Sequence, residues 1–108
     1  MNNKLTIVLT TYNRPKFLKL AIDAILCQSY RRFKLVILDN GSAEETSQLI
    51  MSYNDDRIEY VRNEDNNREF INVAFTYTDL KYFMITHDDD VMKEDLIERH
   101  INKMDLDD

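Results

Sequence analysis

Short apolar runs alternate along the chain with segments of helical periodicity, and this alternation restricts the fold more than any other feature. Four runs are rich in β-branched, aliphatic and aromatic residues and lack a helical period: Leu5–Leu9, Leu35–Leu38, Ile58–Val61 and Tyr82–Ile85. The third of them alternates, as an edge strand does. The continuous apolar runs are typical of strands covered on both faces, as the strands of parallel sheets are.

The first two helices have recognisable starts. Pro15 suits the first turn of a helix capped by Asn13, and apolar residues then recur at three- and four-residue steps as far as Ile25. Ser42 followed by Glu45 is a capping box that predicts the start of a second helix. Each helix would carry the chain from one strand of the sheet to the next.

The remaining gaps predict two further helices. One spans about residues 69–77, although its threonines are poor helix formers, and the other begins near Lys93 with Ile97, Ile101 and Met104 on one face. A β-α-β-α-β-α-β-α order implies right-handed crossovers between parallel strands. We therefore expect an α/β fold, with an open, mostly parallel, Rossmann-like sheet and helices on both faces.

Size and charge restrict the class of partner. A chain of 108 residues with 44% apolar residues is long enough for one core, so we expect residues 1–108 to form a single folded domain. Its 14 basic and 20 acidic side chains give a net charge of −6, which opposes binding to a polyanion, and we expect no nucleic-acid partner. A free nucleotide is anionic too, so binding one requires a bridging cation or well-placed donors.

Two smaller features concern location and redox chemistry. No stretch approaches the roughly 20 apolar residues that cross a bilayer, and the start, Met1–Lys4, lacks the apolar run of a secretory signal. We expect a cytoplasmic protein, with peripheral attachment to a membrane left open. The single Cys27 follows an apolar helical pattern and is expected to be a buried structural thiol.

Polar residues gather where three of the predicted strands end. They are the segments Thr10–Arg14, Asp39–Ser42 and Thr86–Asp90. In open parallel sheets, ligands bind outside the carboxyl ends of the strands, at the point where the strand order reverses. The three segments are therefore expected to meet at one rim.

The run Asp88, Asp89 and Asp90 is the most unusual of these features. Three successive carboxylates repel one another, and a bound cation relieves the repulsion. Hard oxygen ligands suit Mg²⁺ or Mn²⁺, which take one or two protein carboxylates and complete their coordination with phosphate oxygens and water. The structural alternative is that the acids cap the following helix. The presence of two other polar segments at the same rim favours the metal.

Three motifs resemble the family 2 glycosyltransferases. They are Ile7–Pro15, Val36–Ser42, and Tyr82–Asp90 with its downstream acidic helix start Lys93–Leu96. The resemblance covers about residues 4–104. It implies the nucleotide-binding half of a GT-A fold, a nucleoside-diphosphate sugar as donor with a UDP-sugar favoured, and a divalent metal. It also implies transfer with inversion to a hydroxyl group of a glycan or lipid-linked acceptor.

The resemblance assigns roles by position. Its nucleotide-binding set is Thr10, Thr11, Tyr12, Asp39, Asn40, Arg68 and Asp88. Its metal set is Asp89 as principal ligand, with Asp88 and Asp90. Either Asp39 or Asn40 would hydrogen-bond the base, and Asp88 would lie near the ribose or the metal. In the structural alternative, Thr11 and Tyr12 are ordinary turn residues and Asp39 forms an Asx-turn.

Two departures from the family pattern leave choices open. His87 stands where the family often has an acid, so the acidic pattern is shifted by one position and the choice of metal ligands is open by one residue. For the imidazole we expect a hydrogen-bonded structural role. Arg68 lies in a segment where relatives commonly carry glycine and small residues. Its guanidinium either reaches the diphosphate or lies solvated at the surface.

The catalytic base is the missing part. Relatives supply the base that deprotonates the acceptor, and most of the acceptor pocket, from a second half after the metal motif. We therefore expect a donor-binding half, truncated before the acceptor-binding half, inactive alone and able to self-associate through an exposed sheet edge. The alternatives are a catalytically incomplete nucleotide-binding module and, last, a flavodoxin-like receiver domain. The receiver would need acids directly after the first strand, where Thr10–Asn13 stands.

Overall fold

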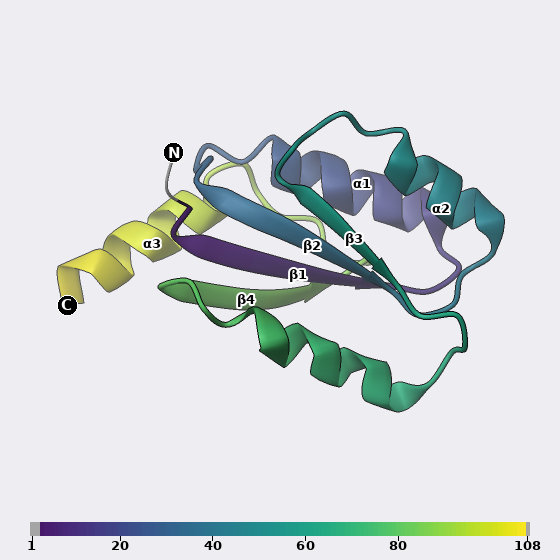
Figure 1. Ribbon diagram of the computed structural model, residues 1–108. Helices are drawn as coiled ribbons and strands as arrows, with labels where there is room; N and C mark the ends of the chain where they lie inside the picture. The colour runs from purple at the N-terminus through teal and green to yellow at the C-terminus, as the bar shows by residue number, and fades with distance from the viewer. Residues whose placement is uncertain (1–2, 108) are drawn as a thin grey trace.

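The computed structural model describes residues 3–107 and contains a four-stranded parallel sheet. Its strands are β1 (Leu5–Thr11), β2 (Phe33–Asp39), β3 (Ile58–Arg62) and β4 (Tyr82–His87). They lie in the order β3-β2-β1-β4 (Figure 1). All four predicted strands are present, and the weakest of them, β3, is an edge strand as its alternation predicts.

The order of the strands reverses beside β1. From β1 the chain runs outward through β2 to β3, and it then returns to place β4 on the other side of β1. Leu5 pairs with both Phe33 and Tyr82, so the strands share a register, and Thr10 lies opposite His87 near their carboxyl ends. This point is where the rule for open parallel sheets locates a ligand.

Helices cover both faces of the sheet, as predicted. The α-helices α1 (Pro15–Leu26), α2 (Glu44–Met51) and α3 (Leu96–Asp107) pack on one face. The other face carries the 3₁₀ helix η1 (Arg68–Tyr77), drawn in green below the sheet in Figure 1. Alternate residues of β1 serve the two layers, because Ile7 and Leu9 belong to the larger core and Val8 to the smaller.

The two predicted helix caps are wrong. The residue before α1 is Arg14 and the residue before α2 is Ala43, and neither helix start has a side-chain cap. Asn13 has a φ of +51°, and its side chain accepts a hydrogen bond from the Ala43 backbone N–H instead. The hydroxyl of Ser42 is likewise occupied, because it accepts from the Asn13 N–H. Tertiary contacts between the two loops have replaced local capping.

Two other helix predictions need correction. The segment predicted at residues 69–77 forms a 3₁₀ helix, in which the Thr76 hydroxyl donates to the Val73 carbonyl at 2.7 Å. Such side-chain bonds to a preceding carbonyl compete with α-helical pairing. The last helix begins at Leu96, three residues after Lys93, and a turn closed by the Leu96 N–H on the Lys93 carbonyl precedes it.

The environment of Cys27 also differs from the expectation. Cys27 follows α1 and is exposed, because the buried stripe of that helix ends at Ile25. Among the described helices, none combines the length and the apolar character needed to cross a bilayer.

Candidate functional site

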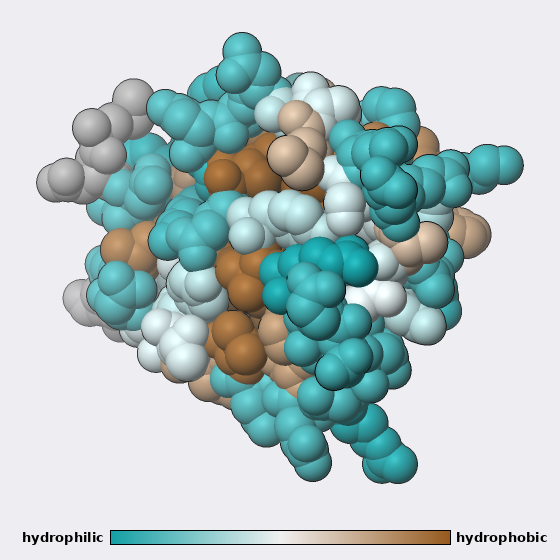
Figure 2. All heavy atoms as spheres, turned by 45° about the vertical axis from the view of Figure 1, so that its right-hand side comes forward, coloured by the Kyte–Doolittle hydropathy of each residue, from teal (hydrophilic) through white to brown (hydrophobic). Residues whose placement is uncertain are grey.

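A cavity of about 510 Å³ lies at the carboxyl ends of β1, β2 and β4. Its lining residues are Thr10, Thr11, Tyr12, Arg14, Leu38, Asn40, Arg68, Phe70, Ile71, His87, Asp88 and Asp89. Seven of the predicted site residues are among them, whereas Asp39 and Asp90 are not. In Figure 2, which turns this end of the sheet forward, hydrophobic residues, in brown, show between hydrophilic ones, in teal.

The seam between β1 and β4 fixes one wall of the cavity. The Asp88 N–H donates to the Thr10 carbonyl at 3.1 Å, which extends the parallel ladder past the end of β4. The Thr11 hydroxyl donates to Asp88 Oδ2 at 3.0 Å, and both residues are buried. Thr10 Oγ1 and His87 Nδ1 share a hydrogen bond of 2.5 Å, so the hydrogen-bonded role expected for His87 is confirmed.

The three consecutive aspartates have different environments. Asp88 is 8% exposed and Asp89 58% exposed in their side chains, and both line the cavity. Asp90 turns back toward the strand, where its Oδ2 accepts from the His87 N–H at 3.3 Å and from the Thr86 hydroxyl at 3.4 Å. Asp90 therefore stabilises the turn after β4, away from the cavity.

Asp88 and Asp89 fit a divalent cation that is also held by a ligand's phosphates. Within residues 3–107 no group of three or more His, Cys, Asp or Glu side chains is arranged to hold a metal ion by itself. Mg²⁺ and Mn²⁺, however, are commonly bound through one or two carboxylates, with phosphate and water completing the shell. Two carboxylates at the edge of a cavity meet that requirement.

Arg14 supplies positive charge beside these acids; it belongs to the polar segment predicted at the rim, but no role was predicted for it. Its Nη1 lies 3.6 Å from Asp88 Oδ1 and 3.9 Å from Asp89 Oδ2. Its position directly after Thr10–Asn13 was the available signal. The cavity also includes Leu38 and two residues of η1, Phe70 and Ile71, which no motif in the sequence singles out.

Asp39 organises the end of β2 from beneath the surface. It is fully buried, and its Oδ1 accepts from the Ser42 N–H at 2.9 Å. Its Oδ2 accepts from the Tyr60 hydroxyl at 2.6 Å and from Arg62 Nη1 at 3.2 Å. The carboxylate thus makes a local backbone contact of the kind that the structural alternative requires, and contact with a base stays a prediction.

Asn40 joins the loop after β2 to the segment before η1. Its amide oxygen accepts from Asn63 Nδ2 at 3.1 Å and from the Asn67 N–H at 3.2 Å, and its Nδ2 donates to the Asn67 carbonyl at 2.9 Å. Gly41 permits the close approach, because at its φ of +86° an added Cβ would lie 3.0 Å from the Asn66 nitrogen. These contacts fix the start of η1, and with it Arg68, at the cavity.

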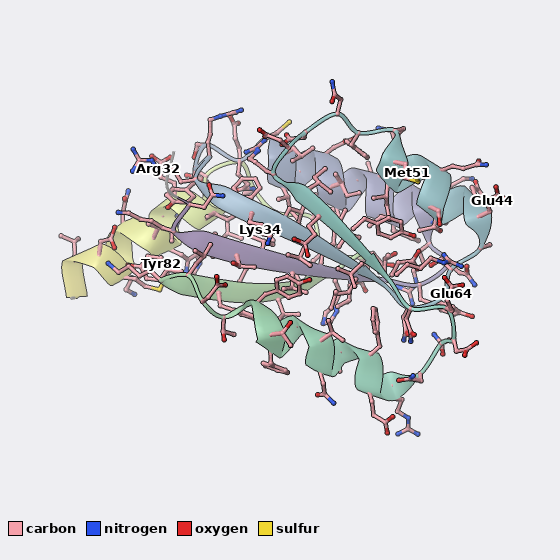
Figure 3. The ribbon with its side chains drawn as sticks, in the orientation of Figure 1. Arg32, Lys34, Glu44, Met51, Glu64 and Tyr82 are labelled. Carbon is pink, nitrogen blue, oxygen red and sulfur yellow. The ribbon has the colours of Figure 1, made fainter. Side chains whose placement is uncertain are left out.

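A second, larger cavity of about 970 Å³ occupies the opposite end of the sheet. Its lining includes Arg31, Arg32 and Arg57 together with acidic side chains. Arg32 lies at the amino ends of the strands (Figure 3), and none of the predicted site residues is in this cavity. The predicted residues thus gather at the carboxyl edge only.

Comparison with known proteins identifies a related family. A model of the family described as "Glycosyl transferase family 2" matches residues 6–108. An uncharacterised glycosyltransferase of Rickettsia prowazekii is 31% identical over 98 residues, which are 90% of this chain and 30% of that protein. Protein CgeD of Bacillus subtilis is 31% identical over 113 residues, covering 95% of this chain and 26% of that protein. The chain thus spans less than a third of the length of these curated relatives.

Solved structures share the fold. Residues 1–349 of Staphylococcus aureus TarS in complex with UDP-GlcNAc match with a TM-score of 0.86 at 19% identity, over 95% of this chain and 31% of that one. A mannosyltransferase of Pyrobaculum calidifontis in complex with GDP-Man and Mn²⁺ matches with a TM-score of 0.73 at 18% identity, over 84% and 29%. The expected GT-A type of fold is confirmed by these likenesses.

Proposed function

The chain belongs to glycosyl transferase family 2, and on this premise we propose that it is the donor-binding part of an enzyme that transfers a sugar from a nucleoside diphosphate to an acceptor hydroxyl. The observation that carries the proposal is the cavity at the carboxyl edge, which collects side chains from the ends of three strands and from η1. Its volume of about 510 Å³ lies in the ordinary range for a small-molecule site.

The nucleoside is proposed to lie between the loops after β1 and β2. Tyr12, 47% exposed, offers an aromatic face, while Leu38 and Phe70 contribute apolar surface to the same cavity. Thr11 and Asn40 supply the polar groups of this wall. A mostly apolar slot with a few placed polar groups suits a flat base and its ribose.

The diphosphate is proposed to lie between the basic and acidic side chains of the cavity. Arg68 and Arg14 provide guanidinium groups, whose planar donors match phosphate oxygens. Asp88 and Asp89 would hold Mn²⁺ or Mg²⁺, the ion that supplies charge stabilisation for the departing diphosphate when it is bound. Phosphate oxygens would complete the coordination that the two carboxylates leave open.

The proposed reaction is a single displacement with inversion. The acceptor oxygen forms a bond to the anomeric carbon as the bond from that carbon to the diphosphate oxygen breaks, and a base removes the hydroxyl proton. The two carboxylates at the cavity are assigned to the metal, so the base and the acceptor pocket are proposed to lie outside residues 1–108. We favour a UDP-sugar as donor, since the TarS structures hold UDP and UDP-GlcNAc.

Calorimetric titration of the 108-residue chain with UDP, GDP and dTDP, each with and without Mn²⁺, tests the proposal. We expect one nucleotide to bind preferentially, with affinity that falls at least tenfold when Mn²⁺ is withdrawn or when Asp89→Ala is introduced. Asp95→Ala is the matched control, because Asp95 is an exposed carboxylate outside the cavity. Metal-independent binding that Asp89→Ala leaves intact would overturn the metal assignment.

A catalytically incomplete nucleotide-binding module is the second candidate. The cavity lining favours this candidate. In the described part of the chain the acidic residues of that lining are Asp88 and Asp89, and both are assigned to the cation and not to a catalytic base. This candidate predicts the same nucleotide affinity, and no release of UDP from a UDP-sugar even by a longer protein that contains this chain, whatever acceptor is supplied. Release of UDP that depends on an acceptor would exclude it.

A further inference from the structure

We infer that Arg14 is an exchangeable counter-cation, which neutralises Asp88 and Asp89 while the metal is absent and turns to the donor's phosphates when the metal enters. The inference rests on the proposed function, since it concerns how that metal site is occupied and emptied. Its basis is the position of one guanidinium nitrogen within ion-pair distance of both carboxylates.

The two contacts are weak enough to be exchanged. At 3.6 Å and 3.9 Å from the carboxylate oxygens, Arg14 Nη1 lies beyond hydrogen-bonding distance of either one. In the described part of the chain, its side chain makes no other ion pair and no hydrogen bond. The side chain is 55% exposed, so it can rotate without disturbing the core. A dedicated structural ion pair would be expected to have tighter, bidentate geometry.

The backbone that carries Arg14 is held firmly by the neighbouring loop. The Asn13 N–H donates to Ser42 Oγ at 2.8 Å, and Asn13 Oδ1 accepts from the Ala43 N–H at 2.7 Å. The Arg14 carbonyl accepts from the Leu18 N–H at 2.8 Å in the first turn of α1. A fixed backbone with a mobile side chain keeps the guanidinium at the cavity in both states.

The Arg14 guanidinium and a divalent ion cannot both lie against the carboxylates of Asp88 and Asp89, because both carry positive charge. A divalent ion between Asp88 and Asp89 would repel a guanidinium held at the same oxygens. The diphosphate of the donor arrives with that ion and offers new acceptors inside the same cavity, which Arg14 also lines. Arg14 therefore competes with the metal in the empty site and supports the nucleotide in the loaded one.

Opposite changes in two affinities test the inference. For Arg14→Ala we expect Mn²⁺ alone, measured by the paramagnetic resonance signal of the free ion, to bind between about 2-fold and 30-fold more tightly, since each of the two long ion pairs of this half-exposed guanidinium is worth roughly 0.2–1 kcal/mol. With Mn²⁺ held at a saturating concentration, UDP should bind several-fold more weakly to the same variant, because the guanidinium proposed to contact its phosphates is missing. Arg14→Lys, which keeps the charge, should bind Mn²⁺ as the unmodified chain does.

The control and the contrary results separate this inference from the proposed function. Arg99→Ala makes the same change in net charge at an exposed site outside the cavity and should alter neither affinity. Unchanged or weaker Mn²⁺ binding by a folded Arg14→Ala would overturn the role of Arg14. If the unmodified chain binds neither Mn²⁺ nor UDP, the proposed function itself fails.

Discussion

Replacing Thr11 with valine tests how much the hydrogen bond from Thr11 on β1 to Asp88, just after β4, contributes to stability. Thr11 and Asp88 are both buried, and the Thr11 hydroxyl donates a 3.0 Å hydrogen bond to Asp88 Oδ2. Valine has nearly the same shape, so Thr11→Val removes the donor and opens no sizeable cavity. A hydrogen bond to a charged acceptor contributes about 1.5–3 kcal/mol. We expect the free energy of unfolding to fall by that amount.

Calorimetric unfolding and urea denaturation of Thr11→Val would measure the loss. A cost of about 1.5–3 kcal/mol corresponds to a fall in Tm of roughly 6–12 °C for a domain of this size. Thr78→Val is the matched control, because the exposed Thr78 hydroxyl makes only a 3.4 Å bond to a carbonyl, and it should cost less than about 0.5 kcal/mol. Equal losses for the two variants would refute the reasoning that Thr11 holds Asp88 in place.

Two further substitutions and one assembly measurement probe other contacts. Gly41→Ala should cost about 1–2 kcal/mol in urea denaturation, because Gly41 has a φ of +86° and a Cβ would crowd the Asn66 nitrogen; a loss under about 0.5 kcal/mol would contradict this. The ion pair with Lys34 and the hydrogen bond from Tyr77 lower the pKa of Glu59. The ionised carboxylate therefore stabilises the fold above its ordinary pKa of 4.5, and this contribution is lost as the pH falls. Glu59→Gln should reduce the dependence of the free energy of unfolding on pH in that acidic range. The hydrogen bond to Glu59 also raises the pKa of Tyr77 from 10.0 to about 12. In an alkaline titration of Glu59→Gln, the phenolate absorbance of Tyr77 should therefore appear at lower pH, and an unchanged midpoint would count against the bond. Self-association through the free edge of β4 stays a prediction, which sedimentation equilibrium would refute by finding a monomer at all concentrations.

The architecture was predictable because its signals are local and repeated. Continuous apolar runs predicted parallel strands, and the buried stripe from Leu18 to Ile25 predicted α1. The helix starts were not predictable in the same way. Asn13 and Ser42 have the composition of caps, but their side chains bind each other's loop, and that contact joins residues 29 positions apart. Capping propensity depends on neighbours along the chain and carries no information about a partner in a distant loop.

The site was predictable at the level of segments and less so at the level of side chains. The rule for parallel sheets brought Thr11, Asn40 and Asp89 to one cavity, since it depends only on strand order. It does not state which way each side chain turns. Asp90 turns to the end of β4 through bonds to the strand itself, and Arg14 turns toward the acids, and these side-chain orientations came only from the structure.

Paramagnetic broadening by Mn²⁺ in the presence of UDP, followed on the amide signals of the isotopically labelled chain, tests the central claim most directly. We expect the signals of Thr11, Asp88 and Asp89 to broaden first. The signals of Arg32 and Lys34, which Figure 3 shows nearer the amino ends of the strands, should persist at the same Mn²⁺ concentration. Broadening centred on the amino ends, or spread evenly over the chain, would contradict a single metal and nucleotide site at the carboxyl edge.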